Sequence, residues 1–167
     1  MTSVEETGRQ ALDEMRRLLG VLRTEDDATE QLAPQPSVSD LDSLVAHVRA
    51  AGLPVDLVVE GEPRPLMSGV DMSAYRIVQE ALTNSLKHAG PAHAHVVLRY
   101  GDHDLRLEVV DDGRGLAADA PASNGGGHGL VGMRERVALF GGELQAGPRK
   151  GGGYAVSARI PLEPVRA

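Results

Sequence analysis

The sequence predicts an α+β fold, a two-layer sandwich in which a mainly antiparallel, mixed sheet packs on helices. The predicted elements follow the order helix, strand, helix, hairpin, long loop, helix, hairpin, and strands joined by a hairpin pair antiparallel. The 167 residues include no Cys, no Trp and 1 Phe, so aliphatic side chains must form the core without disulfides.

The chain begins with a predicted amphipathic helix over residues 2–23, whose apolar stripe includes Leu18 and Leu22. A lone helix of this size cannot bury its own stripe, so we expect it to pair with another chain. The composition then turns to Asp, Glu, Gln, Ser and Pro, and Pro34 and Pro36 break any helix. This stretch is predicted to be a linker.

The elements of the sandwich follow the linker. A helix begins at residue 39, is stopped by Gly52 and Pro54, and precedes a strand over residues 55–60. A longer helix over about 71–89, with Asp71 or Ser73 as its cap, leads into strands at 94–100 and 105–110. The polar segment 112–128 is expected to be a mobile lid. A helix over 130–140 and strands at 143–146 and 154–160 complete the pattern.

The helix over 71–89 has a polar row on one side, formed by Glu80, Asn84, Lys87 and His88. Helical side chains three, four or seven residues apart share a face, so a carboxylate, an amide oxygen and a cation can converge on one ligand. We interpret this row as a place for Mg-ATP chemistry. The alternative is an ordinary solvated helix face.

Two glycine-rich segments flank the predicted lid. Asp111 follows the strand over 105–110, together with Gly113 and Gly115. A buried carboxylate accepts from the exocyclic amine of adenine and repels the carbonyl oxygen of guanine, so Asp111 is the predicted adenine reader unless the segment is a simple turn. Gly127 and Gly129 open the last helix, where free N–H groups bind anions.

Together, residues 80–89, 111–115 and 127–130 resemble the N box and the two glycine boxes of the GHKL ATPases. That superfamily includes histidine kinases, type II topoisomerases, heat-shock chaperones and mismatch-repair ATPases. Segments 75–84 and 127–136 look most like the nitrate-sensor and desaturase-sensor branch of the two-component histidine kinases. The resemblance covers roughly residues 39–162 and implies the Bergerat, or GHKL ATPase, fold.

The resemblance also implies roles for individual residues. Asn84 would supply an oxygen to Mg²⁺, a hard ion that prefers oxygen ligands, and Glu80 would act as general base or orient the acceptor. The implied ATP-binding residues are Asn84, Lys87 and His88 near the phosphates, Asp111 at adenine, Gly113 and Gly115 in the pocket wall, and Gly127, Gly129 and Leu130 at the lid end. Tyr154 stands where many relatives place Thr near adenine, which puts that secondary contact in doubt.

The implied organisation has three parts. Residues 1–24 resemble the second helix of a dimerisation and phosphoacceptor hairpin, 25–38 form a linker, and 39–164 form the catalytic domain. The first helix of the hairpin, with its acceptor histidine, is absent from the sequence. The implied activity is transfer of the γ-phosphoryl of Mg-ATP to a histidine outside this chain, for relay to a response regulator. An anti-sigma-factor type serine kinase and a non-catalytic ATP-binding module that pairs with kinases are the alternatives.

Composition limits which kinds of partner the chain can bind and indicates the compartment in which it works. A net charge of -7 argues against direct binding of nucleic acid. No run approaches the length of a membrane span, so we expect a cytoplasmic chain, whether or not the parent kinase is tethered to a membrane. His47, His93 and His95 lack carboxylate or Cys partners at metal-site spacing, so we expect them to be surface or core histidines.

Overall fold

The computed structural model describes residues 35–114 and 127–162. The predicted helix over 2–23 and positions 115–126 of the predicted lid lie outside the described residues. The elements are η1 (Val38–Asp40), α2 (Leu41–Ala50), β1 (Val55–Glu60), α3 (Ser68–His88), β2 (Ala94–Tyr100), β3 (Asp104–Asp111), α4 (Gly127–Leu139), β4 (Glu143–Pro148) and β5 (Tyr154–Pro161).

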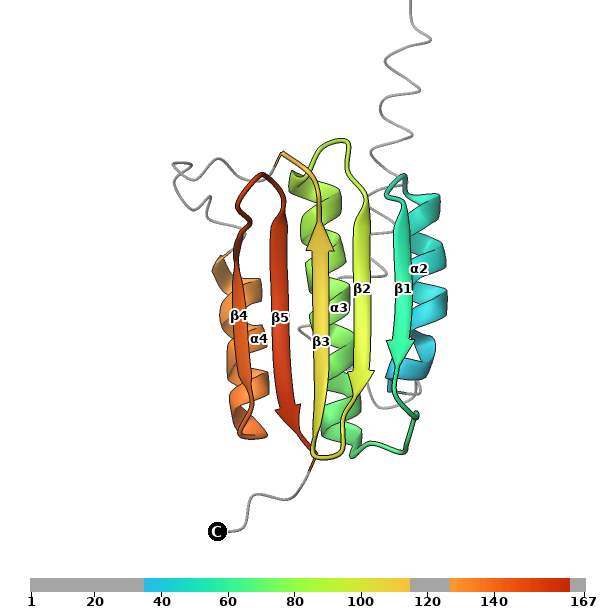
Figure 1. Ribbon diagram of the computed structural model, residues 1–167, viewed down its shortest axis with the longest axis vertical. Helices are drawn as coiled ribbons and strands as arrows, with labels where there is room; N and C mark the ends of the chain where they lie inside the picture. Colours follow the sequence, from blue (N-terminus) through green and yellow to red (C-terminus); the bar gives the residue numbers. More distant parts are fainter. Residues whose placement is uncertain (1–34, 115–126, 163–167) are drawn as a thin grey trace, which may run out of the picture. The chain divides into compact units, whose positions relative to one another are not determined.

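The five strands form one mixed sheet in the order β1-β2-β3-β5-β4. β1 and β2 are parallel, because α3 connects them, and the other three pairs are antiparallel. Helices α2, α3 and α4 cover one face of this sheet (Figure 1). The predicted two-layer α+β sandwich is therefore confirmed. No helix in the described ranges is long and apolar enough to cross a membrane.

Strand periodicity decides which side chains meet the helices. In β3, Leu105, Leu107 and Val109 are buried, and Arg106 and Glu108 between them are exposed. Asp111 continues the odd-numbered series and is therefore carried onto the helix-covered face at the end of β3. The core opposite the sheet includes fully buried Ile77, Val78 and Leu82 of α3.

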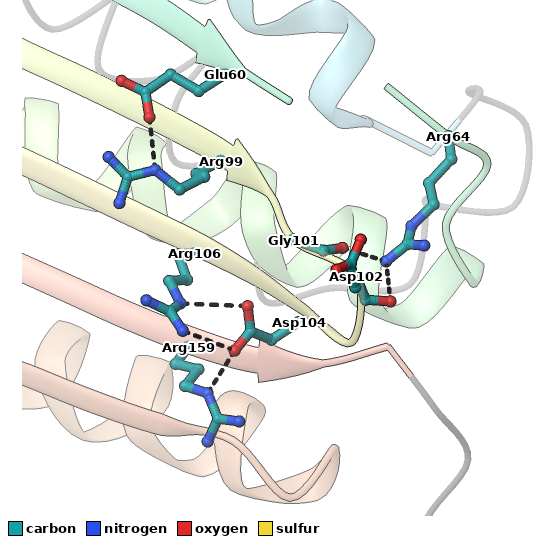
Figure 2. Close-up of polar contacts among 8 residues, drawn as sticks. All are labelled: Glu60, Arg64, Arg99, Gly101, Asp102, Asp104, Arg106 and Arg159. Carbon is teal, nitrogen blue, oxygen red and sulfur yellow. Dashed lines mark hydrogen bonds and ion pairs between the residues drawn. The ribbon is translucent and has the colours of Figure 1, made fainter. Parts of the chain in front are cut away.

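The uncovered face of the sheet carries a row of charges. The strand register aligns one residue from each strand, namely Glu60, Arg99, Arg106, Arg159 and Glu143. Asp104 lies beside this row and accepts from Arg159 Nε at 2.6 Å and Arg106 Nε at 3.2 Å (Figure 2). The hydrogen bond from Arg159 above all, and that from Arg106, hold the pKa of Asp104 below its usual value despite its burial.

The predicted capping of α3 was wrong. The helix begins at Ser68, so Asp71 lies in its first turn and Ser73 in its second. The Asp71 carboxylate instead accepts from the backbone N–H of Val38 at 2.7 Å, and Ser73 Oγ donates to the carbonyl of Gly69 at 2.6 Å. Their polar atoms serve a tertiary contact and an intrahelical bond, which is why cap preferences misplaced the helix start.

Candidate functional site

Asp111 is a buried carboxylate, 4% exposed, at the end of β3. Its Oδ1 accepts from the backbone N–H groups of Gly113, at 3.1 Å, and Tyr154, at 3.3 Å. Its Oδ2 accepts from the hydroxyl of Ser85 on α3, at 2.7 Å. A carboxylate offers about four acceptor positions. Donors from the described residues fill three of them, which leaves one position on Oδ2 in this part of the chain.

The hairpin between β4 and β5 approaches Asp111 closely because its turn ends in glycine. Gly153 has φ +84°, in the left-handed region that favours glycine. A Cβ at this position would also overlap the main-chain oxygen of Asp111. The turn therefore brings the Tyr154 N–H to the carboxylate by backbone contact. Since the donor is the main chain, the departure from Thr at position 154 leaves this hydrogen bond intact.

The predicted polar row lies along the second half of α3. Glu80 and Asn84 are half-buried, and Lys87 and His88 are exposed in the last turn of the helix. The first turn of α4 lies against Glu80, because a Cβ added to Gly129 would overlap Glu80 Oε1. The structure thus brings together Glu80 and Gly129, which are distant in sequence. Leu130, the next residue of α4, is half-buried.

Ser85 donates to the Asp111 carboxylate and was not among the predicted site residues. It is 6% exposed and lies beside Asn84 on α3. Thr83, another buried hydroxyl on the helix, donates to the carbonyl of Gln79 within α3. Ser85 instead bonds a side chain 26 residues away. A buried hydroxyl next to a candidate ligand residue was the available signal.

The predicted site residues differ in how much the structure describes. Asp111 and Gly113 form one end of the site, and Glu80, Asn84 and Gly129 lie along α3 and α4. Gly115 is outside the described residues, and Gly127 is described as the first residue of α4.

Two surface hollows lie at the opposite end of β3 from Asp111. One, of about 650 Å³, is lined in part by Met67, Asp102 and Phe140, and the other, of about 450 Å³, by Tyr100 among others. Neither includes a predicted site residue. The candidate site is therefore defined by the donors and acceptors around Asp111 and along α3, and these hollows play no part in it.

Comparisons with a protein family and with two curated proteins all match histidine kinase-like proteins. The family described as "Histidine kinase-, DNA gyrase B-, and HSP90-like ATPase" matches residues 69–164. The chain is 30% identical over 161 residues to the sensor histidine kinase LiaS of Bacillus subtilis, covering 96% of this chain and 42% of LiaS. It is 34% identical over 138 residues to the sensor histidine kinase NarS of Mycobacterium tuberculosis, covering 80% of this chain and 31% of NarS.

A solved structure agrees with these sequence matches. The histidine kinase domain of the Erythrobacter litoralis EL346 blue-light activated histidine kinase matches with a TM-score of 0.57 and 26% identity, covering 95% of this chain and 83% of that one. The chain spans less than half the length of the two curated relatives, so it corresponds to a part of each of them.

Proposed function

The chain belongs to the family of histidine kinase-, DNA gyrase B- and HSP90-like ATPases, and on that premise we propose that it is the ATP-binding catalytic part of a sensor histidine kinase. It transfers the γ-phosphoryl of Mg-ATP to a histidine of an acceptor hairpin, for relay to a response regulator. The observation that supports this most is the buried Asp111 carboxylate, held by donors from three segments with one acceptor position left.

Asp111 selects adenine in this proposal. The exocyclic amine of adenine donates to the remaining position on Oδ2, whereas guanine presents a carbonyl oxygen there and is repelled. Burial strengthens both effects, because a hydrogen bond is stronger away from water and an unpaired polar group costs more there. Ser85 and the Tyr154 N–H fix the orientation of the carboxylate before the nucleotide arrives.

Asn84 holds Mg²⁺ through its side-chain oxygen. An amide oxygen fits this hard ion, which keeps waters and phosphate oxygens as its other ligands. The ion neutralises charge on the phosphates when bound. Lys87 and His88 follow in the last turn of α3, where their exposure allows them to approach the phosphates. The N-terminal glycines of α4, Gly127 and Gly129, supply backbone donors for the same groups.

Glu80 orients or deprotonates the acceptor histidine. It lies one helical turn before Asn84, and its carboxylate contacts the first turn of α4. This arrangement supports the proposed role, because phosphoryl transfer to histidine needs a group that orients or deprotonates the acceptor near the phosphates.

The remaining assignments follow from the same proposal. Residues 1–24 provide a dimerisation helix that pairs with a second copy, 25–38 form a linker, and 39–164 form the catalytic domain. The response regulator is the downstream protein partner, and the cytoplasm is the compartment in which the chain works.

Calorimetry tests the nucleotide part of the proposal. A non-hydrolysable ATP analogue should bind with Mg²⁺ and more weakly without it, and the matching GTP analogue should not bind. Asp111→Asn should lose the preference for adenine, because an amide can donate to the guanine carbonyl. Asp102→Asn, in the exposed β2–β3 turn, is the matched control. Equal binding of both analogues to the unmodified chain would contradict the assignment of Asp111.

Phosphotransfer tests the reaction. The chain is incubated with radiolabelled ATP and an acceptor hairpin from a relative, and acid-labile phosphohistidine is measured. Asn84→Ala should abolish transfer while the fold, followed by circular dichroism, is retained. Transfer that continues unchanged in this variant would refute the role of Asn84. Acid-stable phosphoserine on a protein partner would instead favour the serine kinase alternative.

A further inference from the structure

Three side chains that can bind metal meet on the uncovered face of the sheet, where β1 and β2 begin. They are Asp56, His93 and His95. Both histidines lie at the surface, which agrees with the prediction, but the fold supplies a carboxylate partner that sequence spacing did not indicate. The parallel register of β1 and β2 places Asp56 opposite His95, and His93 lies two residues before His95 on the same face. Sequence spacing did not reveal the partner because α3 separates the two strands.

The atoms of this cluster are already close together. His93 Nε2 lies 2.9 Å and His95 Nδ1 lies 3.4 Å from Asp56 Oδ2. One ligand atom from each residue lies within 4.8 Å of the others, and the two rings stack with centroids 4.7 Å apart at 6°. Metal–ligand bonds of about 2.0–2.2 Å in a tetrahedral site leave ligand atoms roughly 3.3–3.6 Å apart. To enclose an ion, the two stacked rings must tilt so that their in-plane nitrogen lone pairs converge on it, a side-chain movement that their exposure at the surface allows.

The backbone that carries the histidines is held on both sides. The N–H of His93 donates to Asp112 Oδ1 at 2.6 Å, and the N–H of Asp112 donates to the carbonyl of His93 at 3.1 Å. On the other side, the N–H of Ala94 donates to the carbonyl of Pro54 at 2.9 Å. Ligands on paired strands keep their relative positions better than ligands on loops.

We propose that Asp56, His93 and His95 form a binding site for a divalent transition ion of the Zn²⁺ type. Two imidazole nitrogens and one carboxylate oxygen are the donor set that Zn²⁺, Ni²⁺ and Cu²⁺ accept, whereas Mg²⁺ and Ca²⁺ take oxygen ligands. Water completes the coordination, because the three side chains are 41–58% exposed. An open site of this kind exchanges its ion with solution.

The ion site is separate from the proposed nucleotide site. His95 faces away from the helices, and its neighbours Ala94 and Val96 are buried under them. Asn84, the proposed Mg²⁺ ligand, lies on α3 on the covered face. The two proposals can therefore fail independently, and a large excess of Mg²⁺ should not displace Zn²⁺ from Asp56, His93 and His95.

The test is a Zn²⁺ titration of tag-free, nucleotide-free protein against a fluorescent zinc chelator. We expect one ion per chain. His93→Ala, His95→Ala and Asp56→Asn should each weaken binding at least about tenfold, because losing even a partner of a metal ligand costs roughly 10–100-fold. His47→Ala, an exposed histidine on α2, is the matched control and should bind like the unmodified chain.

Two further measurements distinguish loss of the Zn²⁺ site from misfolding of a variant. Zn²⁺ should raise the melting temperature of the unmodified chain and of His47→Ala, but not of the other three variants. In NMR spectra, Zn²⁺ should shift the ring signals of two of the 6 histidines. In His93→Ala and His95→Ala, the remaining histidine of the pair should no longer show this shift. Absence of saturable binding to the unmodified chain, or an affinity in any of the three site variants equal to that of the unmodified chain, overturns the proposal.

Discussion

Ser85→Ala removes the hydroxyl that donates to Asp111 Oδ2 and changes little else. The bond is 2.7 Å long, and Ser85 and Asp111 are 6% and 4% exposed. We expect the variant to fold, to be less stable, and to bind the ATP analogue more weakly. Its Asp111 carboxylate keeps the two backbone donors to Oδ1 but loses the side-chain donor that orients Oδ2.

The size of the stability loss follows from the charge of the Asp111 carboxylate and from the burial of both residues. A hydrogen bond to a charged group contributes a net of about 1.5–3 kcal/mol, and burial prevents water from replacing it freely. We therefore expect Ser85→Ala to lower the free energy of unfolding by about 2 kcal/mol. For a chain of 167 residues, this loss lowers the melting temperature by roughly 4–8 °C. The nearby Thr83 cannot compensate, since its hydroxyl donates to Gln79 within the helix.

Thermal unfolding followed by circular dichroism measures this effect. Ser157→Ala is the matched control, because Ser157 lies in β5 on the uncovered face of the sheet, and its melting temperature should change little. A double-mutant cycle that combines Ser85→Ala with Asp111→Asn should give a coupling free energy of about 1–2 kcal/mol for the contacting pair. Equal melting temperatures for Ser85→Ala and Ser157→Ala, with no coupling to Asp111, would refute the reasoning.

Two further predictions concern α4 and the uncovered face. Gly129→Ala places a methyl group on the Glu80 carboxylate and should sharply reduce phosphotransfer, whereas Gly132→Ala, which has nothing within 4 Å of its new Cβ, should retain it; equal rates would contradict the contact. Asp104 has a lowered pKa, so its ion pairs stabilise the fold above the unfolded pKa of about 3.9, and this contribution is lost as pH falls toward the lower folded value. Asp104→Asn should therefore flatten the fall of unfolding free energy in acid, and Asp102→Asn should leave it as steep as in the unmodified chain.

The sequence predicted those parts of the fold that local patterns determine. The bounds of β1 and β2 agree with the prediction, because strand-forming residues make up both segments and turn-forming residues lie at their ends. The start of α3 differed by three residues, since Asp71 bonds Val38 instead of capping the helix. Cap preferences describe a helix end in isolation and cannot account for a tertiary partner 33 residues away.

The candidate site was predicted in its residue types but not in its connections. Glu80, Asn84 and Asp111 could be named as candidates because carboxylates and amides at helical or strand-end spacing are typical of ligand-binding sites. The Tyr154 N–H was not, since a backbone donor has no residue type and lies 43 positions from its acceptor. The pairing of Asp56 with His95 was missed for a similar reason, because it depends on a parallel register that no local pattern specifies.

The convergence of three segments on Asp111 also bears on biosynthesis. A nascent chain that ends before Tyr154 already contains Ser85 and Asp111, yet it lacks β5 and the N–H that β5 supplies to Oδ1. The carboxylate then has one donor fewer, and the edge of β3 that pairs with β5 remains open. Under the proposed role of Asp111, nucleotide binding through this carboxylate would depend on the N–H that β5 supplies, and would therefore begin only after β5 has left the ribosome.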